Sequence, residues 1–273
     1  MIRGWQYRIA AFTALASLAG MAQTAQAAQC GNSAAGFENW KREFSQEARA
    51  NGVGQTAISA LMNTDYATAT IRADRGQKSF RLSLDQFMAK RGASVIVSRG
   101  RSLKQSNAAL FASLEQRYGV PPGPLIAIWG METAFGTQRG NQNTLSAVAT
   151  LAYDCRRSEF FTDQLYAALE LIDRGVLSGR TRGSMHGEIG QTQFMPKNIL
   201  QYGRGGNLDN TADALEATAN FLKGHGWRAG AGYQPGEPNF RAIQAWNAAS
   251  VYQQAIALIG QQIDGGSRRS AER

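Results

Sequence analysis

Residues 119–136, GVPPGPLIAIWGMETAFG, combine a proline-rich start with an apolar run and a single charged residue, Glu132. Prolines suit the first turn of a helix, where the amide hydrogens lack intrahelical partners. The segment therefore predicts a buried helix that starts at the prolines and stops near Gly136. A carboxyl group among apolar residues is costly to ionise, so the pKa of Glu132 should be raised, as suits an acid that protonates a glycosidic oxygen. A solvent-facing glutamate at the helix edge is the alternative interpretation.

Apolar residues recur at helical three- and four-residue steps through most of the chain. The clearest stripes span residues 37–48, 110–118, 165–172, 215–222 and 251–258. Strand-like alternation is almost absent, and residues 93–98 are the best candidate for a short strand. Glycine-rich stretches at 203–206 and 230–236 are expected to be loops. The fold class is therefore mainly α, as one domain over residues 28–265, with an N-terminal helical part that extends to about residue 105.

Residues 1–27 have the features of a signal peptide. Arg3 and Arg8 precede an apolar run at 9–21, and Ala25-Gln26-Ala27 supplies the small-x-small cleavage pattern. The run is too short to span a bilayer, and no later stretch is long and apolar enough, so no stable membrane insertion is expected. We predict export to a periplasm; a buried N-terminal helix is the alternative. Residues 266–273 are expected to form a flexible tail.

Cysteine and charge usage narrow the function classes. Cys30 and Cys155 are expected to form a disulfide in an oxidising compartment, with two free thiols as the alternative. Two histidines and two cysteines leave little room for a zinc site, so no metal or other cofactor is predicted. The chain has 29 basic and 20 acidic residues, and this net positive charge fits an acidic partner such as nucleic acid, anionic lipid or a cell-wall polymer. Export and the lack of basic helix clusters argue against nucleic acid.

A second unusual segment spans residues 183–196, GSMHGEIGQTQFMP. Its glycines permit a ligand to approach the backbone closely. Ser184, Gln191, Thr192 and Gln193 offer neutral donors and acceptors that suit sugar hydroxyl and N-acetyl groups. A glycine-rich turn with no binding role is the alternative.

Together the two segments resemble the B-type lytic murein transglycosylases. That family has a proline-led helix ending G-x-E-T-x-x-G and, later, G-S-x-x-G-x-x-G-x-x-Q-F-M-P, and both patterns occur here in order. Three further motifs agree: a basic pair before an aromatic at 156–161, A-N-F-L-x-x-H-G-W at 219–227, and an aromatic-Asn-x-x-Ser site at 246–250. The resemblance covers about residues 35–260.

The resemblance implies a lysozyme-like helical domain with a substrate groove, which cleaves the MurNAc–GlcNAc β-1,4 bond of peptidoglycan without water. Glu132 would be the single catalytic acid and base. Ser184, Gln193 and Asn247 would line the sugar sites, and Arg156 and Arg157 would meet carboxylates of the peptide stem. The aromatic walls of the groove would be Phe221, Trp246 and, as a further candidate, Tyr202. The expected partners are the glycan strands of peptidoglycan, on which the protein would act as a monomer. Partners among the envelope proteins are left open.

Two departures from the family pattern bear on these expectations. Residues 202–210 are too poor in carboxylates for the calcium loop that some members carry, so no calcium is predicted. His186 and Glu188 stand where many members have small or apolar residues. A second carboxylate at Glu188 would open a hydrolytic route, but a structural or rim position is the interpretation we prefer for it. The alternatives to a transglycosylase are thus a lysozyme-type hydrolase and a non-catalytic glycan-binding protein. Intact Glu132, Ser184, Gln193 and Asn247 argue against the latter.

Overall fold

The computed structural model describes residues 28–76 and 82–265, so the predicted signal peptide and the predicted tail lie outside the described residues. Within this part the chain is almost wholly helical, with one two-stranded antiparallel sheet that pairs β1 with β2. The elements are η1 (Ala34–Gly36), α1 (Phe37–Ala50), α2 (Gln55–Met62), α3 (Thr68–Arg75), α4 (Leu84–Lys90), α5 (Ala93–Ser106), α6 (Ala108–Tyr118), α7 (Pro122–Thr133), β1 (Gln142–Asn143), α8 (Thr144–Tyr153), α9 (Ser158–Asp173), β2 (Arg182–Gly183), α10 (Pro196–Tyr202), α11 (Thr211–Gly224), α12 (Phe240–Trp246) and α13 (Ser250–Asp264). The mainly α fold class is confirmed.

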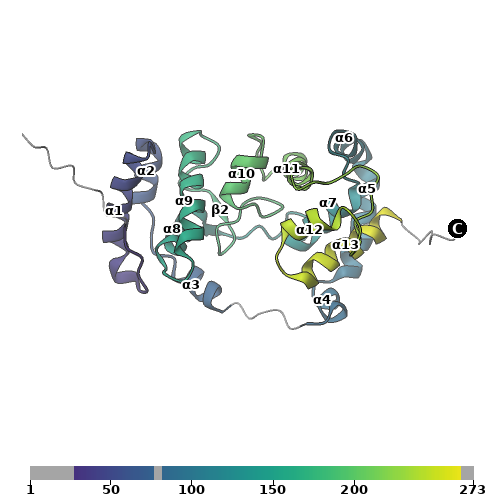
Figure 1. The fold of residues 1–273 in the computed structure, drawn as a ribbon, viewed down its shortest axis with the longest axis horizontal. Coiled ribbons are helices and arrows are strands. Elements are labelled where there is room, and N and C mark those ends of the chain that lie inside the picture. The colour runs from purple at the N-terminus through teal and green to yellow at the C-terminus, as the bar shows by residue number, and fades with distance from the viewer. Residues whose placement is uncertain (1–27, 77–81, 266–273) are drawn as a thin grey trace, which may run out of the picture.

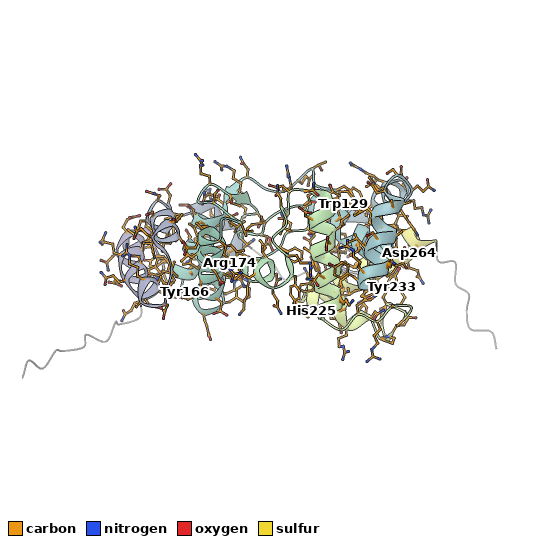
Figure 2. All side chains as sticks on the ribbon, turned by 90° about the horizontal axis from the view of Figure 1, so that it is seen from above. Trp129, Tyr166, Arg174, His225, Tyr233 and Asp264 are labelled. Atoms are coloured by element: carbon orange, nitrogen blue, oxygen red, sulfur yellow. A yellow bond between two sulfur atoms is a disulfide. The ribbon has the colours of Figure 1, made fainter. Side chains whose placement is uncertain are left out.

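The helices form an elongated row with two hydrophobic cores (Figure 1). At one end α1, α2 and α3 pack on α8 and α9; at the other, α4, α5 and α7 pack on α13. Figure 2 places Tyr166 of α9 near one end and Tyr233 and Asp264 near the other. The chain contributes α1–α3 to the first core, α4–α7 to the second, α8 and α9 to the first again, and α10–α13 to the second. The predicted division near residue 105 remains a prediction.

The predicted stripes form the buried faces of helices. In α1, Phe37, Trp40, Phe44 and Ala48 are all buried, because steps of three and four residues keep them on one side of the helix. Helix α9 follows the same rule and is followed by Gly175, whose φ of 72° suits a residue without a side chain. These helices were predictable because their surfaces divide sharply into apolar and polar faces.

The short strand predicted at residues 93–98 is wrong, because these residues open helix α5. Ala93, Ile96 and Val97 are buried together with Gly100, which is a helical spacing rather than an alternation. Gly100 lies so close to Ile126 of α7 and Ile263 of α13 that a β-carbon would come within 2.8 Å of both side chains. Packing against these helices thus outweighs the strand preference of the two valines in the segment.

The turn between α8 and α9 joins three segments of the chain. Cys155 in this turn forms a disulfide with Cys30, with the two α-carbons 5.0 Å apart, which confirms the predicted pairing. The amide of Gly31 also donates to the carbonyl oxygen of Tyr153 at 2.8 Å. Asp154, which is buried, accepts from Arg75 at the end of α3 at 2.5 Å. The N-terminal segment and α3 are therefore both fixed to this turn.

In the part of the chain that the structure describes, no helix is both long enough and apolar enough to cross a bilayer.

Candidate active site

Helix α7 carries Glu132 on its last turn, in the middle of the molecule. Every other described residue from Pro122 to Thr133 is buried, so the helix is fixed on all sides and Glu132 alone reaches a cleft. The helix ends there because Ala134 and Phe135 both adopt the left-handed conformation, with φ of 48° and 62°. Two such residues in succession are costly unless the surroundings hold them in place, which is common at functional sites.

Gln191 provides the contacts that hold this helix end. Its side-chain oxygen accepts from the indole N–H of Trp129 at 2.9 Å, and its carbonyl oxygen accepts from the hydroxyl of Thr133 at 2.5 Å. A β-carbon on Gly136 would come within 2.5 Å of the same side chain, so only glycine allows this approach. Gln191 and Thr192, whose side chains have groups suited to sugars, are both buried. Gln191 instead positions the end of α7.

The carboxyl of Glu132 has the properties of a general acid. Burial of the carboxyl, helped by the negative charge of Glu188, raises its pKa to about 7. A hydrogen bond from the indole N–H of Trp246 to Glu132 Oε1, at 2.9 Å, acts in the opposite direction. The Tyr252 hydroxyl and Arg91 also favour the ionised form, although the buried hydroxyl makes no hydrogen bond of normal geometry within the described residues. Burial outweighs these contacts, so the group holds its proton close to neutral pH.

A small cleft of about 100 Å³ surrounds this acid. Its lining joins residues from α7, the 183–196 segment, α10, α11 and the end of α12. The lining residues are Glu132, Glu188, Gln193, Phe194, Met195, Asn198, Phe221, Trp246 and Asn247. Five of the predicted site residues are thus brought together from positions more than 100 residues apart in the sequence.

The aromatic wall of the cleft is a packed cluster. The ring of Trp246 meets Phe194 and Phe221 edge-on, with centroids 5.3 and 5.0 Å apart. Phe221 is buried and also stacks on His225, so it supports Trp246 as well as lining the cleft. Tyr202 is buried behind Phe221, with ring centroids 5.0 Å apart, and is absent from the cleft lining.

Gln193 and Asn247 both line the cleft, and each side chain is held in a defined orientation. Gln193 has a left-handed backbone, with φ of 57°, and its amide nitrogen donates to the carbonyl of Gly190 at 2.8 Å. That contact leaves its side-chain oxygen as the group available to a ligand. The side-chain oxygen of Asn247 accepts from the amide of Ala249 at 2.9 Å. The side-chain nitrogen of Asn247 therefore points away from the amide of Ala249.

Ser184 does not line the cleft. Its hydroxyl donates to the side chain of Glu188 at 2.8 Å and accepts from the amides of His186 and Glu188, both at 3.1 Å. A hydroxyl has one hydrogen and two lone pairs, so all three are used inside the loop. The loop places the Glu188 carboxylate in the cleft instead. A role for Ser184 at the sugar remains a prediction.

Arg156 and Arg157 lie outside the cleft lining and share a buried carboxylate. Both guanidinium groups bind Asp74 of α3, Arg156 through its Nε at 2.6 Å. Asp74 is only 2% exposed, whereas the arginine side chains are 43% and 37% exposed. Burial of Asp74 opposes its ionisation, but the two arginines outweigh it and lower its pKa. A role at peptide carboxylates remains a prediction. It would use the guanidinium N–H groups of the two arginines that do not bind Asp74.

Sequence reasoning missed several residues of the site. Phe194, Met195 and Asn198 line the cleft because they open α10 and the turn before it, and Tyr252 approaches Glu132 from α13. Tyr252 lies on α13, and its approach to Glu132 depends on the docking of α13 on α7. The buried Asp74 also had no sequence signal, because nothing in its neighbourhood indicates a partner some 80 residues away.

Among residues 28–76 and 82–265, no cluster of three or more His, Cys, Asp or Glu side chains could hold a metal ion. In the loop at residues 202–210, polar groups bind each other and neighbouring residues. Asp209 forms an ion pair with Arg139 at 2.8 Å, and the amide of Asp209 donates to the side chain of Asn207.

Comparisons with known proteins agree with this geometry. The family model described as Transglycosylase SLT domain matches residues 36–236. Among curated proteins, the chain is 37% identical over 139 residues to the membrane-bound lytic murein transglycosylase B of Escherichia coli (strain K12). That match covers 45% of this chain and only 38% of the relative, so the chain spans well under half of that protein's length.

Two solved structures extend the similarity to the fold. SltB3 of Pseudomonas aeruginosa, in complex with NAG-anhNAM-pentapeptide, is 28% identical with a TM-score of 0.77, over 85% of this chain and 80% of that one. The E. coli lytic transglycosylase Slt35, in complex with bulgecin A, is 24% identical with a TM-score of 0.73, over 87% and 96%. The lysozyme-like fold expected from the sequence is therefore confirmed. Since the family model spans residues 36–236, which is most of the chain, this protein belongs to the Transglycosylase SLT domain family.

Proposed function

We propose that this protein is a lytic murein transglycosylase, which cleaves the MurNAc–GlcNAc β-1,4 bond of peptidoglycan and leaves 1,6-anhydroMurNAc ends. The observation that carries the proposal is Glu132: an acid with a pKa of about 7, at the end of a buried helix, in a cleft that is lined mainly by neutral polar and aromatic groups. The P. aeruginosa relative was solved with NAG-anhNAM-pentapeptide, whose anhydro sugar is the product expected of this reaction.

The reaction would use Glu132 twice. Protonated Glu132 first gives its proton to the glycosidic oxygen, and the bond from that oxygen to C1 of MurNAc breaks. The N-acetyl carbonyl of the same sugar stabilises the cationic C1, while Gln193 and Asn247 hold the ring. Ionised Glu132 then takes the proton of the C6 hydroxyl as its oxygen attacks C1. The proton count balances, and water is not consumed.

The location and the stem contacts belong to the same proposal. The features of residues 1–27 support export to the periplasm, where the substrate lies, and the enzyme would act there as a monomer. Arg156 and Arg157 would bind stem-peptide carboxylates through guanidinium N–H groups not engaged by Asp74.

Digestion of purified sacculi in heavy-oxygen water tests the reaction type. The new ends should be 1,6-anhydro sugars, one water lighter than hydrolysed ends, and should carry no label, because the attacking oxygen comes from the sugar. Labelled reducing ends would mean hydrolysis, for which Glu188 in the cleft would be the first residue to examine.

Activity should decline on the alkaline side of neutrality. Glu132 acts first as an acid, so its protonated form is required, and that form disappears as pH rises through about 7. We expect kcat/KM on sacculi to fall about tenfold per pH unit above this value. An enzyme that keeps full kcat/KM two units higher would contradict the assignment of Glu132 as the titrating acid.

A further inference from the structure

The loop between β2 and α10 is built around the hydroxyl of Ser184. The amide of Ser184 donates to the carbonyl of Glu188 at 2.9 Å, and the hydroxyl binds the side chain and the amide of the same glutamate. Gly187 closes this turn with φ of 86°, a conformation that favours glycine. Three hydrogen bonds with Ser184 thus fix the position of Glu188 in the loop.

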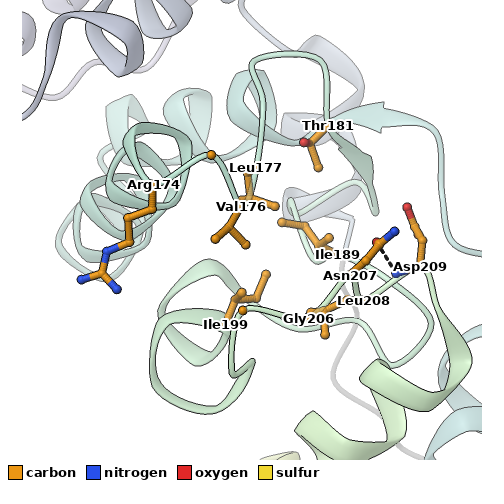
Figure 3. Close-up of a pocket in the computed structure, with 12 residues that line it drawn as sticks. Arg174, Val176, Leu177, Thr181, Ile189, Ile199, Gly206, Asn207, Leu208 and Asp209 are labelled. Carbon is orange, nitrogen blue, oxygen red and sulfur yellow. Dashed lines mark hydrogen bonds between the residues drawn. The ribbon is translucent and has the colours of Figure 1, made fainter.

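Neighbouring side chains of this loop point to different sides. Ile189 is buried and lines a second cavity of about 540 Å³, together with Val176, Ile199 and Leu208 (Figure 3). Its backbone pairs with Phe194 through two hydrogen bonds of 2.9 Å. Glu188, one residue earlier, lines the cleft that contains Glu132. Anchoring of Ile189 on one side therefore fixes the glutamate on the other.

We propose that Glu188 is a second functional carboxylate of this site, which binds the glycan by accepting a hydrogen bond from a sugar hydroxyl or acetamido N–H. This inference rests on the proposed function, since it takes the ligand of the cleft to be a glycan. A carboxylate accepts and cannot donate, so it selects a donor group, which a serine hydroxyl at the same place would not do. Hydrogen bonds to an ionised acceptor are also stronger than those between neutral groups.

The charge of Glu188 has a second consequence for the acid. The groups that act on Glu132 are Trp246 from α12, Tyr252 from α13, Arg91 after α4, and Glu188 from the loop. The first three favour ionised Glu132, and Glu188 is the only one of the four whose charge opposes ionisation. It therefore helps Glu132 to retain the proton that the first step requires.

Glu188→Gln and Glu188→Ala separate these two effects. Glutamine keeps an oxygen that can accept from Ser184, so the loop is preserved while the charge is lost. We expect the alkaline limb of kcat on sacculi to move to lower pH in Glu188→Gln, because removal of a negative neighbour makes Glu132 easier to ionise. Glu115→Gln on α6, which makes the same charge change on an exposed residue, should leave the limb unchanged.

Binding tests the sugar contact independently of turnover. In the Glu132→Gln background, calorimetry with a soluble GlcNAc–MurNAc tetrasaccharide should show affinity about tenfold weaker after Glu188→Ala, the loss of one charged hydrogen bond. Adding Ser184→Ala should weaken binding little further, because Ser184 acts through Glu188. Unchanged affinity in Glu188→Ala, together with an unmoved alkaline limb in folded Glu188→Gln, would overturn the inference. Failure of the wild type to cleave sacculi would instead count against the proposed function, and the binding result would still stand.

Discussion

Replacing Glu132 by glutamine should reduce the cleavage of sacculi by about 10²–10⁴-fold or more, while the protein still folds and binds glycan. The amide has nearly the same shape, and its oxygen can still accept from the indole N–H of Trp246. It cannot deliver a proton to the glycosidic oxygen. Release of soluble muropeptides measures the loss, and circular dichroism checks the fold. A folded variant with more than about a tenth of wild-type activity would exclude Glu132 as the acid.

The same variant should be more stable than the wild type at alkaline pH. The folded protein binds the Glu132 proton more tightly than the unfolded chain, since the pKa rises from 4.5 to about 7 on folding. Wild-type stability therefore falls as pH rises between these two values, by roughly 3 kcal/mol in total. Glutamine carries no charge to bury, so Glu132→Gln escapes this loss. Urea denaturation of both proteins at pH 5 and pH 8 would reveal the difference, which should appear only at the higher pH.

The second large effect should come from the disulfide. Cys30 and Cys155 are 125 residues apart, and the chain-entropy relation gives about 5 kcal/mol for closing a loop of that length. Replacement of both cysteines by serine should therefore lower the free energy of unfolding by several kcal/mol. Urea denaturation of the double variant against the oxidised wild type measures this, and reduced wild type is the matched control.

Thiol titration of denatured, unreduced protein gives an independent check of the pairing. No free sulfhydryl should be found in protein purified from an oxidising compartment. Two titratable thiols, or a double serine variant within about 1 kcal/mol of the wild type, would mean that the bridge does not contribute to the stability of the protein.

The helix that carries the acid was predictable because its signal is local: prolines open an apolar run that contains one glutamate. The run alone left a solvent-facing glutamate open, and the family resemblance favoured the acid, which the structure places in a cleft with a raised pKa. The regular amphipathic helices were predictable for the same reason. Residues 93–98 were not, because the valines there favour a strand locally, and only the packing of α5 on α7 and α13 makes them helical.

The polar residues of the 183–196 segment show more clearly what could not be predicted from the sequence alone. The sequence offers Ser184, Gln191 and Thr192 as groups suited to sugars, and the family resemblance implies a sugar contact for Ser184. Whether such groups face a ligand depends on whether the fold has already satisfied them. Here Gln191 and Ser184 are used internally, and the residue set aside as a rim position, Glu188, lines the cleft. Arg156 and Arg157 are likewise engaged by Asp74, a partner that only the folded chain brings near.

The crossing of the chain between two cores has a consequence for the timing of synthesis. Glu132 lies on α7, but Trp246 and Tyr252 reach it from α12 and α13, which a ribosome delivers more than 100 residues later. Until those helices dock, the carboxyl is open to water and ionises as an ordinary glutamate does. A half-emerged chain therefore has no proton to donate at neutral pH. The acid of the candidate site therefore becomes able to hold its proton at neutral pH only after α12 and α13 have docked.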